Sequence, residues 1–408
     1  MKRRLVASLA LVLTACTHAA AEGSACSVAE GAPVSRHDAP AWSVDLEDAP
    51  SAAATDARGS VVTFSAWVAE FDQQGHERWR ADLPGAGLDW PVLERDVVVV
   101  PTVSFDTGVA GCAAVERADG HVRWAADVGR GSGAVVAVAG GTVVCATGDG
   151  SIAAFARDTG RRRWMADLGA TFGTDDVSVS GRSALAVDTE TGRVAVVARV
   201  GERWMLTCWT LVAGTHDLAC DLDLGVRRAP SAVAVAAPGS LVVGDGDARA
   251  VLLWDLGRHE VRAAVPTADS FDPASIPVVA GGVAVVVDRA GGVTAVDVGR
   301  GEARWRADLD QPVLDVNPSL TADTVHVVDW TGRVHHLRRS DGRRAAPIDE
   351  AGWAIAAVAD PAADGFVTVR RGLDGGRLDG VIPSEESRVR PLQCSTEPGH
   401  STRNDARP

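Results

Sequence analysis

The residues that could carry chemistry in this sequence are carboxylates, one histidine pair and cysteines. Candidate carboxylates on predicted loops are Asp89, Asp175-Asp176 and Asp315, which could bind a divalent cation or act as a base, but their spacing is not diagnostic. His335-His336 lies in a predicted strand, where neighbouring side chains point to opposite faces, so we expect one buried and one exposed histidine. The sequence has no Gly-x-Ser-x-Gly, phosphate loop, His-Glu-x-x-His or dinucleotide fingerprint.

The N-terminal cysteine lies in an export signal. Lys2-Arg3-Arg4 precedes an apolar run over residues 5–13, and small residues follow it, which predicts a secretory signal. The tetrapeptide Leu13-Thr14-Ala15-Cys16 resembles a bacterial lipobox. This resemblance implies a signal peptide over residues 1–15 and a diacylglycerol on Cys16, which would anchor the protein to a membrane without spanning it. The alternative is an ordinary secretory signal cleaved after residues 19–21, with Cys16 discarded.

The other six cysteines could form disulfides, because an exported protein meets an oxidising compartment. Cys26 and Cys394 flank the body of the chain and could tie its two ends. Cys208 and Cys220 lie on either side of Gly214 and could face each other across a hairpin. Cys112 and Cys145 remain as a third pair, with buried free thiols as the alternative.

The element that must position these residues is a repeat. A Gly stands four residues before a Trp, and Asp follows the Trp after three residues, as in the stretch from Gly160 through Trp164 to Asp167. We call this pattern the docking repeat. Its other intact copies are Gly75/Trp79, Gly120/Trp124 and Gly301/Trp305, Trp42 begins a copy without Gly, and degenerate copies are Gly214/Leu218, Gly257/Val261 and Gly342/Ala346. The resulting spacing of about 40 residues is typical of propeller blades.

The segments between docking repeats predict short strands. β-branched runs such as residues 97–100 and 283–287 alternate with Gly-containing turns, and no helical periodicity is present in the body. Each repeat is therefore expected to form a four-stranded antiparallel blade. We predict an all-β, eight-bladed propeller over residues 41–383, with the strand at Trp42 completing the last blade and closing the ring. Seven blades are the alternative, because the interval from Trp164 to Leu218 is long.

The composition limits the classes of partner. Hydrophobic residues make up 46% of the chain, which allows a large core, and the formal net charge of -14 disfavours nucleic acid and anionic membrane surfaces as partners. Residues 16–40 are rich in small residues and predict a flexible tether, and residues 384–408 predict a polar tail. We expect a monomeric propeller.

The docking repeat resembles the tryptophan-docking repeat of quinoprotein alcohol dehydrogenases and related non-enzymatic propellers. The segment from Asp158 through Gly160 to Trp164 carries the resemblance, which covers roughly residues 40–383. It implies that Trp42, Trp79, Trp124, Trp164 and Trp305 wedge between blades, and that these residues and their glycines are structural. An outer-membrane assembly lipoprotein of the BamB type shares this architecture and anchor.

The resemblance also implies an alternative activity, because the family's enzymes hold pyrroloquinoline quinone (PQQ) with Ca²⁺ on the propeller axis. The chain lacks their pair of adjacent cysteines, and its only asparagines are Asn317 and Asn404, so a PQQ-dependent oxidoreductase is disfavoured and we expect no cofactor. A carbohydrate-binding or carbohydrate-cleaving propeller is a third class.

The preferred interpretation is a non-enzymatic, lipid-anchored extracytoplasmic scaffold, envelope-assembly or sensing protein that binds envelope proteins through its loops. It would lie on the cell membrane, or on the outer membrane if the cell has one. The tryptophans outside the docking repeat are the candidates for its binding surface, although core packing could also explain them: Trp67, Trp90, Trp330 and Trp353.

Overall fold

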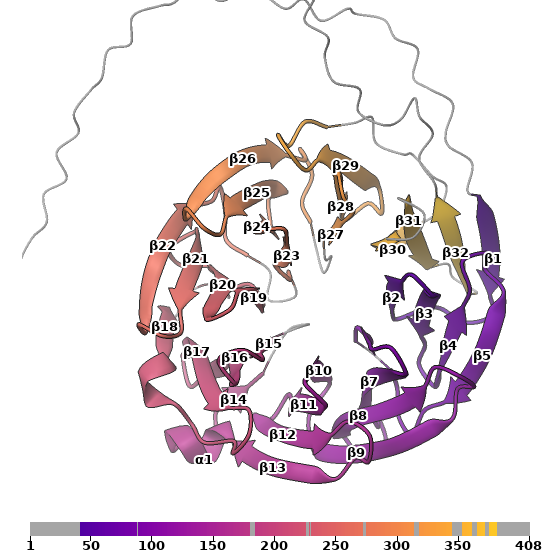
Figure 1. Cartoon of the computed structure of the whole chain (residues 1–408), viewed down its shortest axis with the longest axis horizontal. Helices are drawn as coiled ribbons and strands as arrows, with labels where there is room; N and C mark the ends of the chain where they lie inside the picture. The colour runs from indigo at the N-terminus through magenta and orange to yellow at the C-terminus, as the bar shows by residue number, and fades with distance from the viewer. Residues whose placement is uncertain are drawn as a thin grey trace, which may run out of the picture. The chain divides into compact units, whose positions relative to one another are not determined.

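The protein forms a closed ring of antiparallel sheets (Figure 1). The computed structural model describes residues 41–381, apart from residues 88, 180–183, 226–227, 229, 272–274, 314–317, 345–352, 361–364 and 372–374. Apart from the short helix α1 (Leu168–Phe172) and the 3-10 helix η1 (Leu218–Cys220), the regular elements are strands. They form eight sheets, so the chain is an eight-bladed β-propeller and the seven-bladed alternative is excluded.

Most blades are meanders whose first strand lies nearest the centre of the ring and whose last strand lies at its periphery (Figure 1). Blade 1 consists of β2 (Ala52–Asp56), β3 (Gly59–Thr63), β4 (Trp67–Phe71) and β5 (Glu77–Asp82), and blade 2 of β6 (Val92–Leu93), β7 (Val97–Val103), β8 (Val109–Glu116) and β9 (Val122–Arg130). Blade 3 consists of β10 (Ala134–Ala139), β11 (Thr142–Thr147), β12 (Ser151–Ala156) and β13 (Arg162–Asp167). Blade 4 consists of β14 (Val177–Ser178), β15 (Leu185–Asp188), β16 (Arg193–Val200), β17 (Arg203–Thr210) and β18 (Leu222–Gly225).

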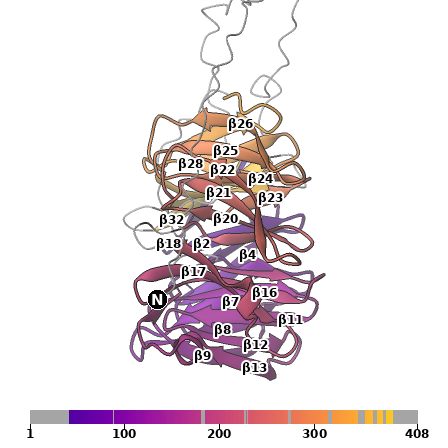
Figure 2. The same ribbon diagram turned by 90° about the vertical axis from the view of Figure 1, so that its left-hand side faces the viewer.

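Blades 5 to 7 follow the same order. Their strands are β19 (Val233–Ala237), β20 (Ser240–Asp245), β21 (Ala250–Asp255) and β22 (Glu260–Pro266); β23 (Val278–Ala280), β24 (Val283–Val287), β25 (Gly292–Asp297) and β26 (Glu302–Asp308); and β27 (Ser319–Leu320), β28 (Thr324–Val328) and β29 (Val334–Arg338). Seen from the side, the strands of successive blades lie one above another (Figure 2).

Blade 8 joins the two ends of the ring. It consists of β30 (Trp353–Asp360), β31 (Gly365–Arg371), β32 (Gly376–Val381) and, outermost, β1 (Trp42–Leu46). β1 pairs antiparallel with β32, from Trp42 opposite Gly380 to Leu46 opposite Gly376. Side chains add to this backbone ladder, because Asp379 accepts hydrogen bonds from Ser43 and Arg377. The predicted closure by the strand at Trp42 is confirmed.

Docking tryptophans connect blade 8 to 1, 1 to 2, 2 to 3, 3 to 4 and 6 to 7. Each indole Nε1 donates to a backbone carbonyl of the following blade: Trp79 to Arg117 at 3.1 Å, Trp124 to Arg157 at 2.6 Å, Trp164 to Leu211 at 2.7 Å and Trp305 to Arg339 at 2.8 Å. The accepting residue stands three positions before a glycine, and the ring covers that glycine: Gly120, Gly160, Gly214 and Gly342 respectively. Trp42 covers Gly75 in the same way. The repeat is therefore a contact between neighbouring blades.

The degenerate copies of the repeat do not dock as their spacing suggests. Leu218 lies on η1 and is exposed, because the outermost strand of blade 4 begins only at Leu222. Val261 is also exposed, and Gly301 is covered by Ala263 instead. Ala346 lies outside the described residues. The spacing of the repeat does not by itself identify the residue that faces the next blade when the tryptophan is missing.

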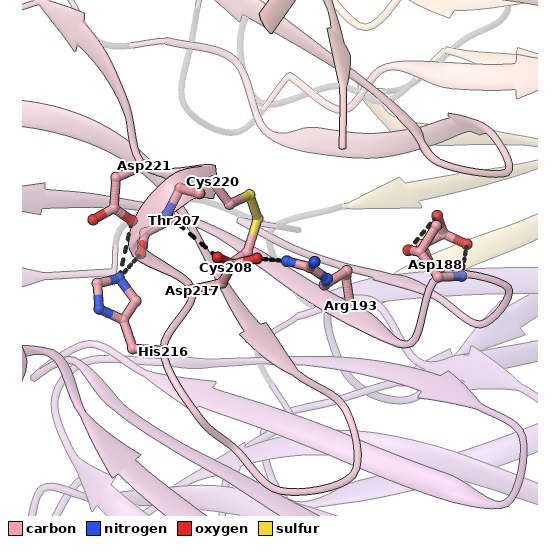
Figure 3. Close-up of a disulfide and its surroundings, with 10 residues drawn as sticks. Asp188, Arg193, Thr207, Cys208, His216, Asp217, Cys220 and Asp221 are labelled. Carbon is pink, nitrogen blue, oxygen red and sulfur yellow. Dashed lines mark hydrogen bonds and ion pairs between the residues drawn. A yellow bond between two sulfur atoms is a disulfide. The ribbon is translucent and has the colours of Figure 1, made fainter. Parts of the chain in front are cut away.

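One of the expected disulfides is present. Cys208 of β17 and Cys220 of η1 are bonded, which closes the connection between the third and fourth strands of blade 4 (Figure 3). Beside the bond, His216 Nε2 lies 2.9 Å from both Thr207 Oγ1 and Asp221 Oδ1. The partner of Cys208 thus stands on a short helix beyond the turn, not on the opposite strand of a hairpin.

The expected disulfide between Cys112 and Cys145 is not formed. Both are free and fully buried where blades 2 and 3 pack together. Their thiols are hydrogen-bonded, and that contact together with burial raises the pKa of Cys145 well above its usual value. The Cys145 thiol therefore remains protonated in the core. Cys26 and Cys394 lie outside the described residues.

A buried ion-pair network joins blades 1 and 2. The guanidinium of Arg117 is fully buried, and its Nη2 lies 2.8 Å from Glu70 Oε1 and 3.0 Å from Asp56 Oδ1. Glu70 is also buried and accepts the Trp79 indole at 2.9 Å. Glu70 therefore has its charge balanced by a residue of the following blade.

Candidate interaction surface

One face of the ring gathers two kinds of connection. Because the strands of a meander alternate in direction, the connections between second and third strands emerge on the same face as those that lead from one blade to the next. We call this the loop face. It includes residues 47–51, 64–66, 83–91, 104–108, 148–150, 168–176, 201–202 and 329–333. The remaining connections emerge on the opposite face.

All four candidate tryptophans stand at the loop face. Trp67 begins β4 directly after the loop-face connection 64–66, and Trp353 begins β30 opposite Arg371, the last residue of β31; Trp90 lies in the connection 83–91 and Trp330 in 329–333. They come from blades 1, 7 and 8 and from the connection between blades 1 and 2. The structure thus places them on one face, but only some of them reach its surface.

Trp67 is an anchor for the fold. It is 7% exposed, stacks on Phe64 with ring centroids 3.5 Å apart, and donates its indole Nε1 to Asp48 Oδ2 at 2.7 Å. The guanidinium of Arg80 lies 4.0 Å from its ring centroid. Trp67 is therefore held by contacts within the chain and offers little exposed surface to a partner.

The other tryptophans differ in exposure. Trp90 is half-buried and packs against the core shared by blades 1 and 8. Trp330 is 48% exposed, and its Nε1 donates to Gln311 Oε1 at 3.1 Å, which orients the ring. The side chain of Trp353 lies outside the described residues. Trp330 is therefore the member of the set whose described surface can meet another molecule.

Sequence reasoning missed the most exposed aromatic residue of this face. Phe105 is 70% exposed at the tip of the hairpin that joins β7 to β8. A cavity of about 400 Å³ lies beside that hairpin, between the connection at Pro84-Gly85, the strand β9 and the hairpin residues Thr102, Ser104 and Thr107. The signal in the sequence was the lengthening of this repeat between residues 101 and 111.

Carboxylates in the turns of the loop face accept hydrogen bonds that stabilise those turns. Asp149 accepts the amide of Arg130 at 2.6 Å, the amide of Ser151 at 3.1 Å and the hydroxyl of Thr147 at 2.7 Å. Burial works to raise the pKa of Asp149, but these hydrogen bonds outweigh it and hold the pKa below its usual value. Asp329 is held in the same way by Thr331 and His335.

Both histidines of the adjacent pair are buried. The sequence pattern predicted one buried and one exposed histidine at His335-His336, but blade 7 is covered on both faces. His335 Nε2 lies 2.8 Å from Asp329 Oδ2, and His336 Nδ1 lies 2.9 Å from Nδ1 of His326 on β28.

The candidate carboxylates among the described residues do not form a cluster. Asp175 and Asp176 are exposed in the connection after α1, Asp89 lies between blades 1 and 2, and Asp315 lies outside the described residues. Among the described residues, no three His, Cys, Asp or Glu side chains are placed to hold a metal ion. Within the same residues no helix is both long and apolar enough to cross a membrane.

The fold and these contacts define a class and then a family. A ring whose outer-strand indoles cover the glycine turns of the next blade is a tryptophan-docking propeller with PQQ-like repeats. The chain belongs to the family described as outer membrane protein assembly factor BamB, whose model matches residues 27–256 and 207–364. No curated protein matched the sequence.

Solved structures share the fold at low identity. The crystal structure of BamB from Moraxella catarrhalis has a TM-score of 0.58 and 14% identity, and the match covers 85% of this chain and 98% of that one. The computationally designed Ika8 protein has a TM-score of 0.61 and 14% identity, and the match covers 85% of this chain and 100% of that one. Saccharomyces cerevisiae Sqt1 has a TM-score of 0.65 and 11% identity, and the match covers 86% of this chain and 100% of that one. These likenesses concern architecture.

Proposed function

We propose that this chain is a non-enzymatic extracytoplasmic lipoprotein whose loop face binds protein partners of the cell envelope. In this proposal Cys16 carries the lipid, residues 16–40 form the tether, and residues 41–383 form a rigid, monomeric propeller that presents its loops to the partner. The role is that of a scaffold for envelope assembly, in keeping with the description of the matching family.

The observation that carries the proposal is the position of the exposed aromatic side chains. Phe105 and Trp330 are the large aromatics exposed among the described residues, and both lie on the loop face. Aromatic side chains bury much area at little conformational cost and are enriched at binding hot spots. The polar cavity beside Phe105 adds a concave element to the same face.

The experiment that tests the proposal is site-specific photo-crosslinking in intact cells. A photoreactive residue at position 105 or 330 is expected to capture the same saturable envelope partner. The control position is Val212, which is 83% exposed in a connection on the opposite face. Equal capture from position 212 would contradict a role for the loop face.

The purified partner then allows a quantitative test. Phe105→Ala and Trp330→Ala are each expected to weaken its binding about tenfold or more, whereas Val212→Ala leaves it unchanged. Binding to cell-wall glycans instead, lost in Trp330→Ala, would favour the carbohydrate-binding class. Dye reduction after addition of PQQ and Ca²⁺ would favour the oxidoreductase. Lipidation is tested separately, since Cys16→Ser is expected to abolish incorporation of labelled fatty acid.

A further inference from the structure

The polar cavity beside Phe105 is a candidate site for one side chain of a partner. Its volume of about 400 Å³ lies at the lower end of the range of pockets that hold small ligands. Ser104 and Thr107 of the β7–β8 hairpin bring hydroxyl groups to its wall, and Asp127 of β9 brings a carboxylate. Of the residues that line the cavity, Asp127 is the one that carries a charge.

An irregularity of blade 2 positions this carboxylate. β9 continues for three residues past Asp127 and ends at Arg130. The register between β8 and β9 shifts between Ala110 and Gly111, which leaves Val128 as an extra, buried residue directly after Asp127. Bulges of this kind change the direction of the side chains beside them. The lengthened repeat therefore builds the cavity and places Asp127 in its wall.

The equivalent aspartate of the docking repeat has another task in two other blades. Asp167 of blade 3 accepts the amide of Ala170 at 2.8 Å and caps α1. Asp308 of blade 6 accepts the amide of Asp310 at 2.9 Å. Both carboxylates thus hold the turn that follows their strand. In the described part of the chain, no hydrogen bond or ion pair involves the side chain of Asp127, and β9 continues as a strand beyond it.

The cavity wall offers hydrogen-bond acceptors to an occupant. A carboxylate at neutral pH accepts hydrogen bonds and donates none. Ser104 Oγ accepts the amide of Thr107 at 3.4 Å, and Thr107 Oγ1 accepts the amide of Val109 at 3.3 Å, so each hydroxyl keeps a further lone pair. A guanidinium or an ammonium group, which has several donors and no acceptor, is the side-chain chemistry that matches this wall.

The rim of the cavity extends the same chemistry. Phe105 and Asp106 are both exposed at the tip of the hairpin. An aromatic face attracts a cation placed over it, and Asp106 adds a second negative charge. Arg130 is exposed opposite Val109 of the cavity wall, but it does not line the cavity. The rim and the wall therefore favour a positively charged occupant.

The loop face around the cavity is acidic in blades 1 to 4. The connections 47–51, 83–91, 104–108, 168–176 and 201–202 contain no Lys or Arg, and their acidic residues are Glu47, Asp48, Asp89, Asp106, Asp175, Asp176 and Glu202. On the opposite face of the same blades, the connections 57–58, 94–96 and 157–161 contain Arg58, Arg95, Arg157 and Arg161. A surface with one sign of charge attracts partners of the other sign.

We propose that this cavity receives an arginine or lysine side chain from a basic segment of the envelope protein that the loop face binds. The inference rests on the proposed function and names the chemistry of its partner. The entering cation pairs with Asp127, and its N–H groups donate to the hydroxyls of Ser104 and Thr107. The aliphatic part of the same side chain packs against Phe105.

Fluorescence anisotropy of labelled tetra-arginine amide with the purified full chain tests the cavity directly. Binding is expected at about 50 mM salt and should weaken toward about 300 mM, because salt screens exposed charges. Asp127→Asn, which keeps the size of the side chain, is expected to weaken binding about tenfold, and Phe105→Ala about threefold. The matched control is Asp323→Asn, at an exposed carboxylate in the connection 321–323 on the opposite face, which should leave binding unchanged.

Three results of this experiment would overturn the proposal. The first is a lack of binding of tetra-arginine amide to the unaltered chain at low salt. The second is an equal loss of affinity in Asp323→Asn and Asp127→Asn. The third is competition for the cavity by a neutral oligosaccharide of N-acetylglucosamine whose binding needs Asp127 and does not change with salt, which would make the cavity a glycan site.

The partner captured from position 105 separates this inference from the proposed function. If that partner binds Asp127→Asn as tightly as the unaltered chain, the loop face keeps its role and the proposal for the cavity is wrong. If no envelope protein is captured while binding of tetra-arginine amide still depends on Asp127, the proposed function fails and the cavity remains a site for basic peptides.

Discussion

The indole Nε1 of Trp164 donates a hydrogen bond of 2.7 Å to the carbonyl oxygen of Leu211, which belongs to the next blade. The ring of the same tryptophan covers Gly214, three residues further on. One side chain thus satisfies a turn carbonyl and fills the space above a glycine. Contacts of this kind recur around the ring, so cohesion between blades is distributed over several seams.

Removing one docking indole should destabilise the whole ring. Trp164→Ala is expected to lower the free energy of unfolding by about 3–5 kcal/mol, because it leaves a cavity between blades 3 and 4 and an unpaired carbonyl. Trp330→Ala, at a half-exposed indole, should cost under about 1 kcal/mol. Urea unfolding followed by circular dichroism measures both, and equal costs would show that docking does not carry the seam.

The glycine beneath the indole should also be sensitive to substitution. Gly214 has a φ of 64°, and an added Cβ would lie 2.5 Å from the ring of Trp164, so Gly214→Ala should cost about 2–4 kcal/mol. Gly201 has a φ of 60° with open space around it, so Gly201→Ala isolates the backbone strain, at about 1–2 kcal/mol. Thermal unfolding of the two variants should therefore differ, and a larger loss at Gly201 would contradict the packing argument.

The disulfide of blade 4 should contribute to the free energy of unfolding, and this contribution should be sensitive to a reductant. Cys208 and Cys220 are 12 residues apart, and opening a loop of this size by Cys208→Ser/Cys220→Ser should cost about 3 kcal/mol in the chain-entropy account. Addition of a reductant to the unaltered protein should reproduce this loss. Cys112→Ser, by contrast, should make no difference to the effect of the reductant, which the unfolding midpoints will show.

The buried guanidinium of Arg117 should be far more sensitive than a surface arginine. Arg117→Met leaves the buried Glu70 with only the longer ion pair to the partly exposed Arg78, at 3.6 Å, and is expected to cost about 3–5 kcal/mol. Arg123→Met removes surface ion pairs to Glu116 and Asp96 and should cost under about 1 kcal/mol. Denaturant unfolding of both variants at neutral pH makes the comparison, and a small loss at Arg117 would mean that the network is dispensable.

Acid should weaken the ion-pair network around Arg117 below about pH 4. Partial burial works to raise the pKa of Asp56, but the hydrogen bonds and charge of Arg117 outweigh it and hold that pKa below its usual value. The contribution of Asp56 to stability is therefore present above about pH 4 and is lost as the pH falls through the folded pKa. Asp56→Asn should flatten this part of the stability profile, and so should Arg117→Met. An unchanged profile in Asp56→Asn would contradict the assignment.

Much of the fold follows from local rules. A turn that needs a positive φ selects Gly160 or Gly214, and alternation along a strand puts Trp164 on a face that must be buried. The ends of the ring were also predictable, because one surplus outer strand at Trp42 matched one blade without its own. The copies at Leu218 and Val261 were misplaced because, without an indole, spacing does not identify the residue that meets the next blade.

The amino-acid sequence by itself determined the repeat, favoured eight blades over seven and indicated the closing strand, since these follow from a regular period along the chain. Only the tertiary structure decided which of many arginines is the buried Arg117, that Cys112 and Cys145 stay unbonded, and that His336 meets His326. It also showed Phe105 at the surface of the loop face and Trp67 beneath it. Such environments arise where two blades or a blade and a loop meet, and the period that builds each blade does not encode what its neighbour places opposite.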